Sequence, residues 1–377
     1  MKSEPVPIKQ CTLSVMDTIA DPDISFDDKG ICNYYYEFQT KKLLRDFSED
    51  PNKLNEIISA IKKEGKGKAY DCIIGVSGGV DSTYLAYLTK QWGLRPLAVH
   101  LDNGWNSELA VKNIENTLNK LQIDLTTKVL NWHEFKSLQI SFLKSSTPDG
   151  EIPTDHAIFA TLFETAAKHN IKYILNGNNF TTESVMPITW SYGHIDWKYI
   201  KAIHKQFGDR RLKNYPHLTL FRYLYYTLFK RVKIVSILNY MPYNKAEAMH
   251  ILQDKLNWKY YGGKHYESVY TRFFQGYWLP EKFNIDKRKA HLSTLIFSKQ
   301  IKKQEALAEL EKPIYPETLK DEDLQFVLKK LELTQQDFQN LKESPTKTFR
   351  NYPTSYKLHA KLRKLLNFLR GKKIMYS

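Results

Sequence analysis

The stretch Ala69-Tyr-Asp-Cys-Ile-Ile-Gly-Val-Ser-Gly-Gly-Val-Asp-Ser-Thr83 decides the fold of this chain. Its first half, Cys72-Ile-Ile-Gly-Val76, is a short apolar run with β-branched residues, which is typical of a strand buried on both faces of a parallel sheet. Ser77-Gly78-Gly79 then allows a turn with positive φ, and Asp81-Ser82 opens a helix. A strand, a glycine turn and a helix N-terminus together predict an anion site built from backbone N–H groups and the helix dipole.

The loop is not a Walker A motif, because no Lys follows the glycines. Ser-Gly-Gly-Val-Asp-Ser instead resembles the pyrophosphate loop (PP-loop) of the ATP pyrophosphatases, the adenine nucleotide alpha hydrolase-like group that includes GMP synthetase and the tRNA thiolases. The bland alternative is a turn that only joins a strand to a helix. The resemblance implies that ATP is cut between its α and β phosphates and that AMP passes to a carbonyl-type oxygen. It assigns ATP binding to Ser77, Gly78, Gly79, Val80, Asp81 and Ser82.

The chain around this loop alternates between apolar strand-like runs and longer amphipathic segments. This alternation predicts an α/β fold with a doubly wound parallel sheet. Ligands of such a sheet bind at the carboxyl ends of its strands, so the loops that follow the strands should share one edge. The expected strands are 72–76, 95–102, 124–130, 172–175 and, less regularly, 232–238; the expected helices between them are 106–121, 131–143 and 154–169.

Polar residues follow two of these strands at the shared edge. The resemblance implies that Asp102 contacts the nucleoside, and that Asn178 and Glu183 face the pyrophosphate and its Mg²⁺, a hard cation that prefers oxygen ligands. Asp81 is a second candidate for the metal. Asp102-Asn103-Gly104 and Asn176-Gly177 are also good turn sequences, which is the plain structural alternative. The full set expected at this edge adds Asn176 and Gly177 for ATP, and Asn179 for the substrate.

The N-terminal segment indicates which family within the PP-loop group the chain resembles. Val15-Met16-Asp17-Thr18 and Phe26-Asp27-Asp28-Lys29-Gly30-Ile31-Cys32-Asn33 resemble the start of the N-acetyl sugar amidotransferases, the WbpG-type enzymes of surface-polysaccharide synthesis. That family usually carries two Cys-x-x-Cys pairs here, whereas this chain has Ser14 and Tyr35 at the partner positions. Two thiolates do not complete a tetrahedral site, so we expect no zinc at Cys11 and Cys32. We expect aromatic packing by Tyr34, Tyr35, Tyr36 and Phe38 to hold the segment instead.

A second stretch, Gly262 to Ser293, resembles the same family along its whole length. It mixes cations, hydroxyls and carboxylates among aromatic residues, which suits pyrophosphate and a sugar; a solvated basic helix start is the alternative. The resemblance assigns charge stabilisation in catalysis to Asp81, Lys264, Arg272, Lys287 and Arg288. It assigns substrate contacts to Asn179, Glu183, His265, Glu267, Ser268 and His291.

The resemblance also implies a reaction. The acetamido oxygen of a nucleotide-linked sugar attacks ATP, ammonia displaces AMP, and an acetamidino sugar results, for O-antigen or related lipopolysaccharide synthesis. The expected cofactors are ATP and Mg²⁺. No glutaminase signature is visible, so ammonia is expected from a partner glutaminase through a barrel subunit resembling that of imidazole glycerol phosphate synthase. The rivals are a tRNA-modifying PP-loop enzyme and a catalytically decayed scaffold.

Composition and charge indicate which partners and which cellular location are to be expected. The net charge of +15 over 377 residues implies an anionic partner, and residues 198–233 carry ten basic residues against Asp209 alone. Nucleic acid is not the favoured partner, although Arg and Tyr interleave in 215–229, because Leu218, Phe221, Leu224, Tyr225 and Leu228 read more readily as a core stripe. No apolar run approaches the ~20 residues of a membrane-spanning helix, and no signal core opens the chain, so we expect a cytoplasmic protein.

The sequence divides into four expected parts. Residues 1–64 form the N-terminal segment and a helix or helix pair from residue 40, and residues 65–185 form the PP-loop core. Residues 186–300 form an aromatic, helical region that completes the site. Residues 301–377 form accessory helices, ending in a basic amphipathic helix at 355–369.

Overall fold

The structure of the protein is a computed structural model that describes residues 8–44, 51–263, 266–358 and 361. Its centre is a β-sheet. Five parallel strands run in the order β3-β2-β1-β4-β5. The predicted α/β fold with a parallel, doubly wound sheet is confirmed. Lys264, His265 and most of the predicted tail helix lie outside the described residues. The strands are β1 (Cys72–Gly75), β2 (Pro96–Asp102), β3 (Asp124–Val129), β4 (Tyr173–Asn176) and β5 (Lys233–Ser236).

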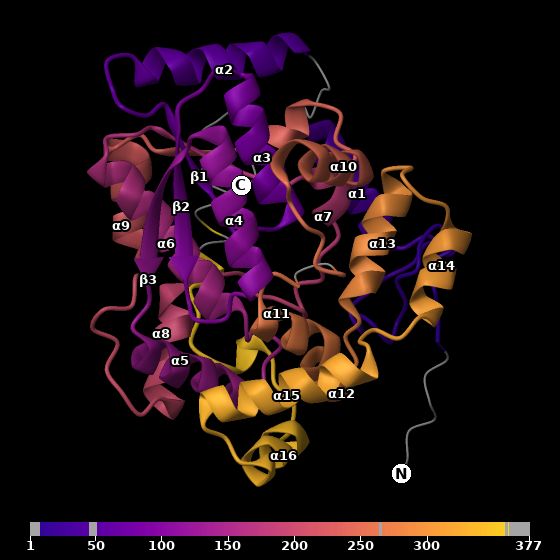
Figure 1. Cartoon of the computed structure of the whole chain (residues 1–377). Helices are drawn as coiled ribbons and strands as arrows, with labels where there is room; N and C mark the ends of the chain where they lie inside the picture. The colour runs from indigo at the N-terminus through magenta and orange to yellow at the C-terminus, as the bar shows by residue number, and fades with distance from the viewer. Residues whose placement is uncertain (1–7, 45–50, 264–265, 359–360, 362–377) are drawn as a thin grey trace, which may run out of the picture.

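Helices cover both faces of this sheet, and the strand side chains alternate between them. In β1, Cys72 and Ile74 pack toward α2 (Pro51–Gly65), α3 (Val80–Gln91) and α4 (Glu108–Leu121), whereas Ile73 packs toward α6 (Ile152–Lys168). Figure 1 shows α4 in front of the strands. A strand buried on both faces needs a continuous apolar run, which explains why Cys72 to Val76 shows no polar alternation.

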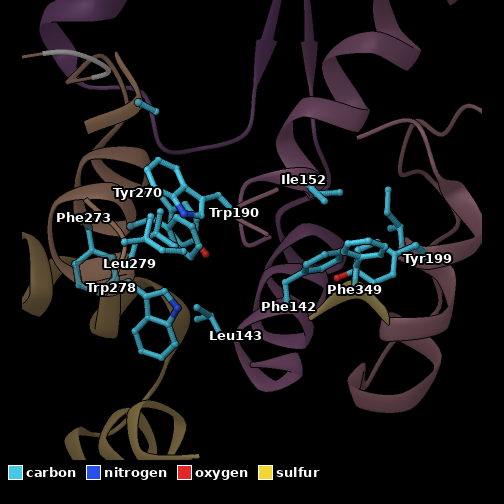
Figure 2. Packing of buried hydrophobic residues seen from close by; sticks show 14 of the residues in the cluster. Phe142, Leu143, Ile152, Trp190, Tyr199, Tyr270, Phe273, Trp278, Leu279 and Phe349 are labelled. Carbon is cyan, nitrogen blue, oxygen red and sulfur yellow. The ribbon is translucent and has the colours of Figure 1, made fainter. Parts of the chain in front are cut away.

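The other helices extend from the carboxyl edge of the sheet. An aromatic core joins them, and Figure 2 shows Phe142, Tyr199 and Phe349 on one side of it and Tyr270 and Trp278 on the other. These residues come from segments more than 200 positions apart, so the C-terminal helices belong to the same packed unit as the sheet. The helices of this core are α5 (Trp132–Ser145), α7 (Phe180–Glu183), α8 (Trp197–Phe207), α11 (Val269–Phe273), α12 (Leu279–Phe283), α13 (Lys287–Phe297), α15 (Glu317–Leu331) and α16 (Gln335–Glu343). Outside it, α10 (Lys245–Leu256) packs on α3, and α14 (Lys303–Glu311) packs on α13.

The N-terminal segment packs on α13 and α14, at the side of the molecule opposite α9 (Leu220–Leu224) (Figure 1). Val15 N–H donates to Ser293 Oγ at 3.3 Å, and Lys303 Nζ donates to the Cys11 carbonyl at 2.7 Å. The predicted aromatic packing is present: Phe38 stacks on Phe180 at 4.7 Å between ring centroids.

The predicted helix start at residue 40 is wrong, because α1 runs from Asn33 to Leu44. Tyr34 and Phe38 are four residues apart and both buried, which is a helical spacing that the surrounding turn-forming residues disguise. Tyr36, on the other face, is half exposed and donates to Asp27 at 2.6 Å.

The core stripe predicted within 215–229 is also wrong. The helix begins only at Leu220, after the cap residue Thr219, and continues as a π-helix over Tyr225–Phe229. Leu218 is buried, but it belongs to the extended segment before the helix. The buried face instead carries Tyr223 and Tyr226, whose rings lie 5.6 and 5.8 Å from that of Phe163, so Phe221 and Leu228 point to solvent.

Candidate active site

The glycine loop lies where the strand order reverses. The chain proceeds from β1 through β2 to β3 on one side and later adds β4 and β5 on the other, so β1 and β4 flank the crevice where ligands of such sheets bind. The loops after these two strands touch. A Cβ atom placed on Gly177 would lie 2.9 Å from the carbonyl carbon of Asp81. Only glycine allows this approach, which holds the start of α3 against the end of β4.

The loop itself is shaped as the sequence predicts. Gly78 has φ +82°, and a Cβ atom there would lie 2.6 Å from the carbonyl oxygen of Ala110 in α4. Ser82 Oγ lies 3.3 Å from the Ser77 N–H, and the Gly79 N–H donates to Ser77 Oγ at 3.3 Å. These long hydrogen bonds stabilise the turn, and the N–H groups of the loop lie together at the amino end of α3. The arrangement is an anion cradle of backbone donors.

Two tyrosines and three carboxylates border the cradle. The Tyr243 hydroxyl donates to Asp81 Oδ1, and burial, with the added charges of Asp81 and Glu183, raises the pKa of Tyr243 far above its ordinary value. An ideal Cβ on Gly79 would lie 3.2 Å from Glu267 Oε1 and 3.4 Å from Tyr261 Oη. Asp81, Glu183 and Glu267 therefore lie around one loop although they come from three separate parts of the chain.

These groups fit ATP with Mg²⁺. Asn176 Oδ1, at the end of β4, is buried and lacks a hydrogen-bond partner among the described residues, so it is available to a ligand. Within the same residues no three His, Cys, Asp or Glu side chains form a metal cage. Mg²⁺ commonly takes one or two carboxylates and completes its shell with phosphate oxygens and water, which is what Asp81 and Glu183 offer. Asn178 is exposed in the adjoining loop, whereas Asn179 caps α7 by accepting from Thr182 N–H at 2.9 Å.

The end of β2 forms the next part of the edge. Asp102 Oδ1 accepts from the Gly104 N–H at 2.8 Å, which is the predicted Asx turn. Lys330 of α15 donates to the Gly104 carbonyl and lies 4.9 Å above the ring of Trp105. The turn reading of Asp102 is thus present, and its second carboxylate oxygen is left for the nucleoside contact that the resemblance implies.

The segment around Glu267 is joined directly to this edge. Asn106 and Ser268 form an antiparallel bridge, the Ser107 N–H donates to the Glu267 carbonyl at 2.9 Å, and Val269 N–H donates to the Trp105 carbonyl at 2.9 Å. Ser268 also caps α11 through the Thr271 N–H. Two of the predicted substrate residues therefore reach the strand ends by main-chain pairing, which sequence spacing alone did not show.

The predicted cations have protein partners. Arg272 makes a bidentate ion pair with Asp323 at 2.6 and 2.7 Å, and Lys287 lies 3.2 Å from Glu151. Arg288 binds Asp286 at 2.9 Å and donates to carbonyl groups after α14. His291 Nδ1 lies 2.9 Å from the Thr182 carbonyl. Their catalytic and substrate roles stay predictions, and the contacts show that Arg272 and Arg288 also hold helices together.

Sequence reasoning missed several residues at this edge. Tyr243 and Tyr261 contact the loop, and Trp258 Nε1 donates to the Gly78 carbonyl at 2.9 Å. No role was predicted for these three residues from the sequence, because no motif includes them. Beyond β3, a cavity of about 430 Å³ opens at the start of α5. It is lined by Asn131, His133, Glu134, Arg210, Arg211 and Lys213.

The N-terminal cysteines lie together as the family pattern implies. Cys11 Sγ accepts from the Cys32 N–H at 3.2 Å, and Ser14 Oγ lies 3.9 Å from Cys32 Sγ. The hydrogen bond from the Cys32 thiol lowers the pKa of Cys11 to about 5. Ser14 thus lies beside the two thiols, at a position where the family pattern usually has a cysteine, and the absence of zinc remains a prediction.

Residues 267–363 match the family model of the "LPS biosynthesis protein WbpG-like, C-terminal domain". This C-terminal part of the chain is thus similar to the WbpG-like family. The match begins at Glu267, the residue that lies against Gly79, and it includes the ion pair between Arg272 and Asp323.

Three relatives match shares of the chain that range from 37% to 83%. The chain is 25% identical over 324 residues to the uncharacterized protein MJ1599 of Methanocaldococcus jannaschii, covering 83% of this chain and 97% of that one. It is 28% identical to a tRNA-specific 2-thiouridylase of Fusobacterium nucleatum, over 37% of this chain and 40% of the relative. It is 29% identical to a glutamine-hydrolyzing GMP synthase of Pyrobaculum aerophilum, over 41% and 30%.

Solved structures give weaker similarities. An NH3-dependent NAD synthetase from Campylobacter jejuni is 16% identical, covers 71% of this chain and 100% of its own, and has a TM-score of 0.31. An NMN synthetase from Francisella tularensis is 15% identical over 55% and 87%, with a TM-score of 0.30. These scores are too low to bear on the function of this chain.

Proposed function

We propose that the chain is an ATP-dependent, AMP-forming amidotransferase that converts the acetamido group of a nucleotide-linked N-acetyl sugar into an acetamidino group. The observation that carries the proposal is the contact between Gly79 of the glycine loop and Glu267, the first residue of the WbpG-like segment. The glycine loop therefore lies against the start of the WbpG-like segment, which supports a site shared by a nucleotide and a sugar. The coarser conclusion, a nucleotide-using ligase, has further support from the GMP synthase relative.

The reaction balances without a protein nucleophile. The acetamido oxygen attacks the α-phosphorus, the bond from that phosphorus to the bridging oxygen breaks, and pyrophosphate leaves. Ammonia adds to the activated carbon, loses a proton, and AMP departs with the former acetamido oxygen. The backbone N–H groups of Ser77 to Gly79 hold the departing pyrophosphate, and alignment and charge stabilisation supply most of the acceleration. Mg²⁺ bound near Asp81 and Glu183 would neutralise phosphate charge.

The rest of the edge has room for the second substrate. The nucleotide-sugar carries its own diphosphate, which needs cations apart from those at the ATP loop. Arg210, Arg211 and Lys213 line the cavity at the start of α5, on the carboxyl edge beyond β3, and supply them.

Isotope transfer tests the proposal directly. The chain is incubated with ATP, Mg²⁺, ammonium chloride and candidate nucleotide sugars carrying ¹⁸O in the acetamido group. We expect the label in AMP and a product one mass unit lighter than the unlabelled sugar. Pyrophosphate release with no ¹⁸O in AMP for any acetamido sugar contradicts the proposal. Tight, salt-sensitive tRNA binding with tRNA-dependent pyrophosphate release would favour the tRNA-modifying alternative.

A further inference from the structure

A patch of large apolar side chains is exposed on the segment from Leu220 to Phe229. It consists of Phe221, Leu224, Tyr225, Leu228 and Phe229, and we refer to it as the aromatic patch. Phe221 is 84% exposed, Phe229 79% and Leu228 62%. Single exposed apolar residues are normal on protein surfaces, but a contiguous group of this kind marks an interaction site.

The helical segment that carries the patch packs on α6 through its opposite face. Tyr223 and Tyr226 pack on Phe163 of α6, and the Thr219 side chain caps the helix by accepting from the Arg222 N–H at 3.2 Å. The patch residues recur at spacings of three, four, seven and eight, so they form the opposite face. The segment is therefore fixed by one face and presents the other to solvent.

Only cations accompany the patch in its own segment. Residues 219–233 contain Arg222, Lys230, Arg231 and Lys233 and no acid. Lys172 joins them, because its Nζ donates to the Lys230 carbonyl at 2.8 Å. Glu164 of α6 acts on Tyr226, at the packed face, where the charge of Arg222 opposes it. Apolar side chains that protrude among cations complement an anionic surface with an apolar interior.

The patch is separate from the candidate active site. The segment leads directly into Lys233, the first residue of β5, so it lies at the amino edge of the sheet, whereas the glycine loop lies at the carboxyl edge. Figure 1 shows α9 at the side of the molecule away from α13 and α14. A surface bound here leaves the carboxyl edge open.

We propose that the aromatic patch docks the protein on a lipid bilayer that contains anionic headgroups. Phe221, Leu228 and Phe229 enter the headgroup and acyl boundary, and Lys230 and Lys233 meet the lipid phosphates. None of the described helices is long and apolar enough to cross a membrane. The proposed attachment is therefore peripheral, reversible and weakened by salt.

Vesicle flotation with the full chain tests this. The wild type should float with vesicles that contain phosphatidylcholine and the anionic lipid phosphatidylglycerol at a molar ratio of about 7:3. It should float much less with vesicles of pure phosphatidylcholine. Phe221→Ser with Phe229→Ser should lower the bound fraction on the order of tenfold. Lys230→Gln with Lys233→Gln should lower it and remove its salt dependence. Leu43→Ser is the matched control, since Leu43 is 83% exposed on the basic helix α1, and it should bind as the wild type does.

The outcomes are separable. Wild-type protein that stays with the unbound fraction, or a serine double variant that floats as well as the wild type, overturns the proposal. A double variant that changes from dimer to monomer in light scattering, without vesicle binding by the wild type, makes the patch an interface between copies and also overturns it. Circular dichroism melts establish that each variant is folded. Amidine formation from nucleotide sugar in solution should persist in the serine variant, because the patch lies at the amino edge of the sheet and the glycine loop at the carboxyl edge.

Discussion

Single glycines set the distances in this site. Gly78 combines φ +82° with an approach to the Ala110 carbonyl that leaves no room for a methyl group. Gly78→Ala should therefore displace the loop or α4 and lower kcat/KM by about 100-fold or more, as the loss of charge-stabilising donors does elsewhere. Steady-state pyrophosphate release measures this.

Gly75→Ala is the matched control for that variant. Gly75 has no positive φ, and its added Cβ would lie 3.7 Å from the Leu162 side chain, an ordinary contact. It should keep activity within a fewfold of the wild type. If both variants are equally active, the glycine loop does not hold the pyrophosphate.

A buried histidine links stability to pH. His156 Nε2 accepts from the Leu218 N–H at 2.9 Å and Nδ1 lies 2.5 Å from the His194 carbonyl, so the neutral ring satisfies both groups. Burial lowers its pKa to about 4. The unfolded chain therefore binds a proton first as pH falls below about 6.5, and the folded state loses about 2 kcal/mol by pH 5 from this group.

Denaturant unfolding at pH 7 and pH 5 measures this loss. His156→Gln keeps a neutral donor and acceptor and removes the titration, so its stability should fall less between the two pH values than that of the wild type. An equal fall in both proteins would mean that His156 is not the group responsible. His194, whose pKa burial also lowers to about 4, should still contribute in the variant.

Between elements, the buried ion pair of Arg272 and Asp323 fastens α11 to α15. The two side chains are 14% and 6% exposed, and the Tyr315 hydroxyl also donates to Asp323. Arg272→Met should cost about 3–5 kcal/mol, because it leaves a buried carboxylate without its partner. The double variant Arg272→Met with Asp323→Leu should recover much of that loss in chemical unfolding.

This cycle also separates two roles of Arg272. If the arginine serves only to join the helices, the double variant should regain activity together with stability. If it also contacts phosphate, as the family resemblance implies, the double variant should be stable and still have a lowered kcat. Equal instability of the single and double variants would contradict the ion-pair argument.

The inner strands β1 and β4 were predictable because each is an apolar run buried in the sheet, whereas the edge strand β3 is mostly exposed. Cys72 to Val76 and Lys172 to Leu175 were identified for that reason, and β1 and β4 are where they were expected. Helices that pack through aromatic residues were harder. The periodicity in 215–229 could not show which face packs on Phe163, so Phe221 was placed in the core although it is exposed.

The site was predictable only where it follows from strand ends. Asp81, Asn176 and Gly177 come together because parallel strands finish at one edge. Tyr243 and Tyr261 reach the loop through tertiary packing that no local pattern encodes. Glu267, which the family resemblance alone assigned to the substrate, reaches it through the pairing of Asn106 with Ser268. Arg272 and Arg288 were predicted from their resemblance to the family motif. In the structure each of them forms an ion pair with a carboxylate of the protein.

For the whole molecule, the source of ammonia distinguishes a lone enzyme from one member of an assembly. Cys11, Cys32 and Cys72 are all buried, which does not suit a glutaminase nucleophile. The purified chain should therefore form product with ammonium chloride and show on the order of 1% of that rate with glutamine alone.

Addition of a glutaminase and its barrel subunit should restore the use of glutamine. Product formation from glutamine by the pure chain, at a rate similar to that with ammonium, would contradict the expected partnership. Ammonia titration across pH 7 to 9 controls for the fraction of unprotonated ammonia, so that the two nitrogen sources are compared at equal free NH₃.

The main-chain bridge between Asn106 and Ser268, with Lys330 bound to the Gly104 carbonyl, has a consequence during protein synthesis. The ribosome completes the glycine loop long before it makes the residues that enclose it. A nascent or prematurely terminated chain can form strands β1 to β4 but has neither Glu267 nor Lys330 at their ends. On the proposed function, the edge that would hold ATP and the sugar is therefore complete only after Lys330 has been synthesised.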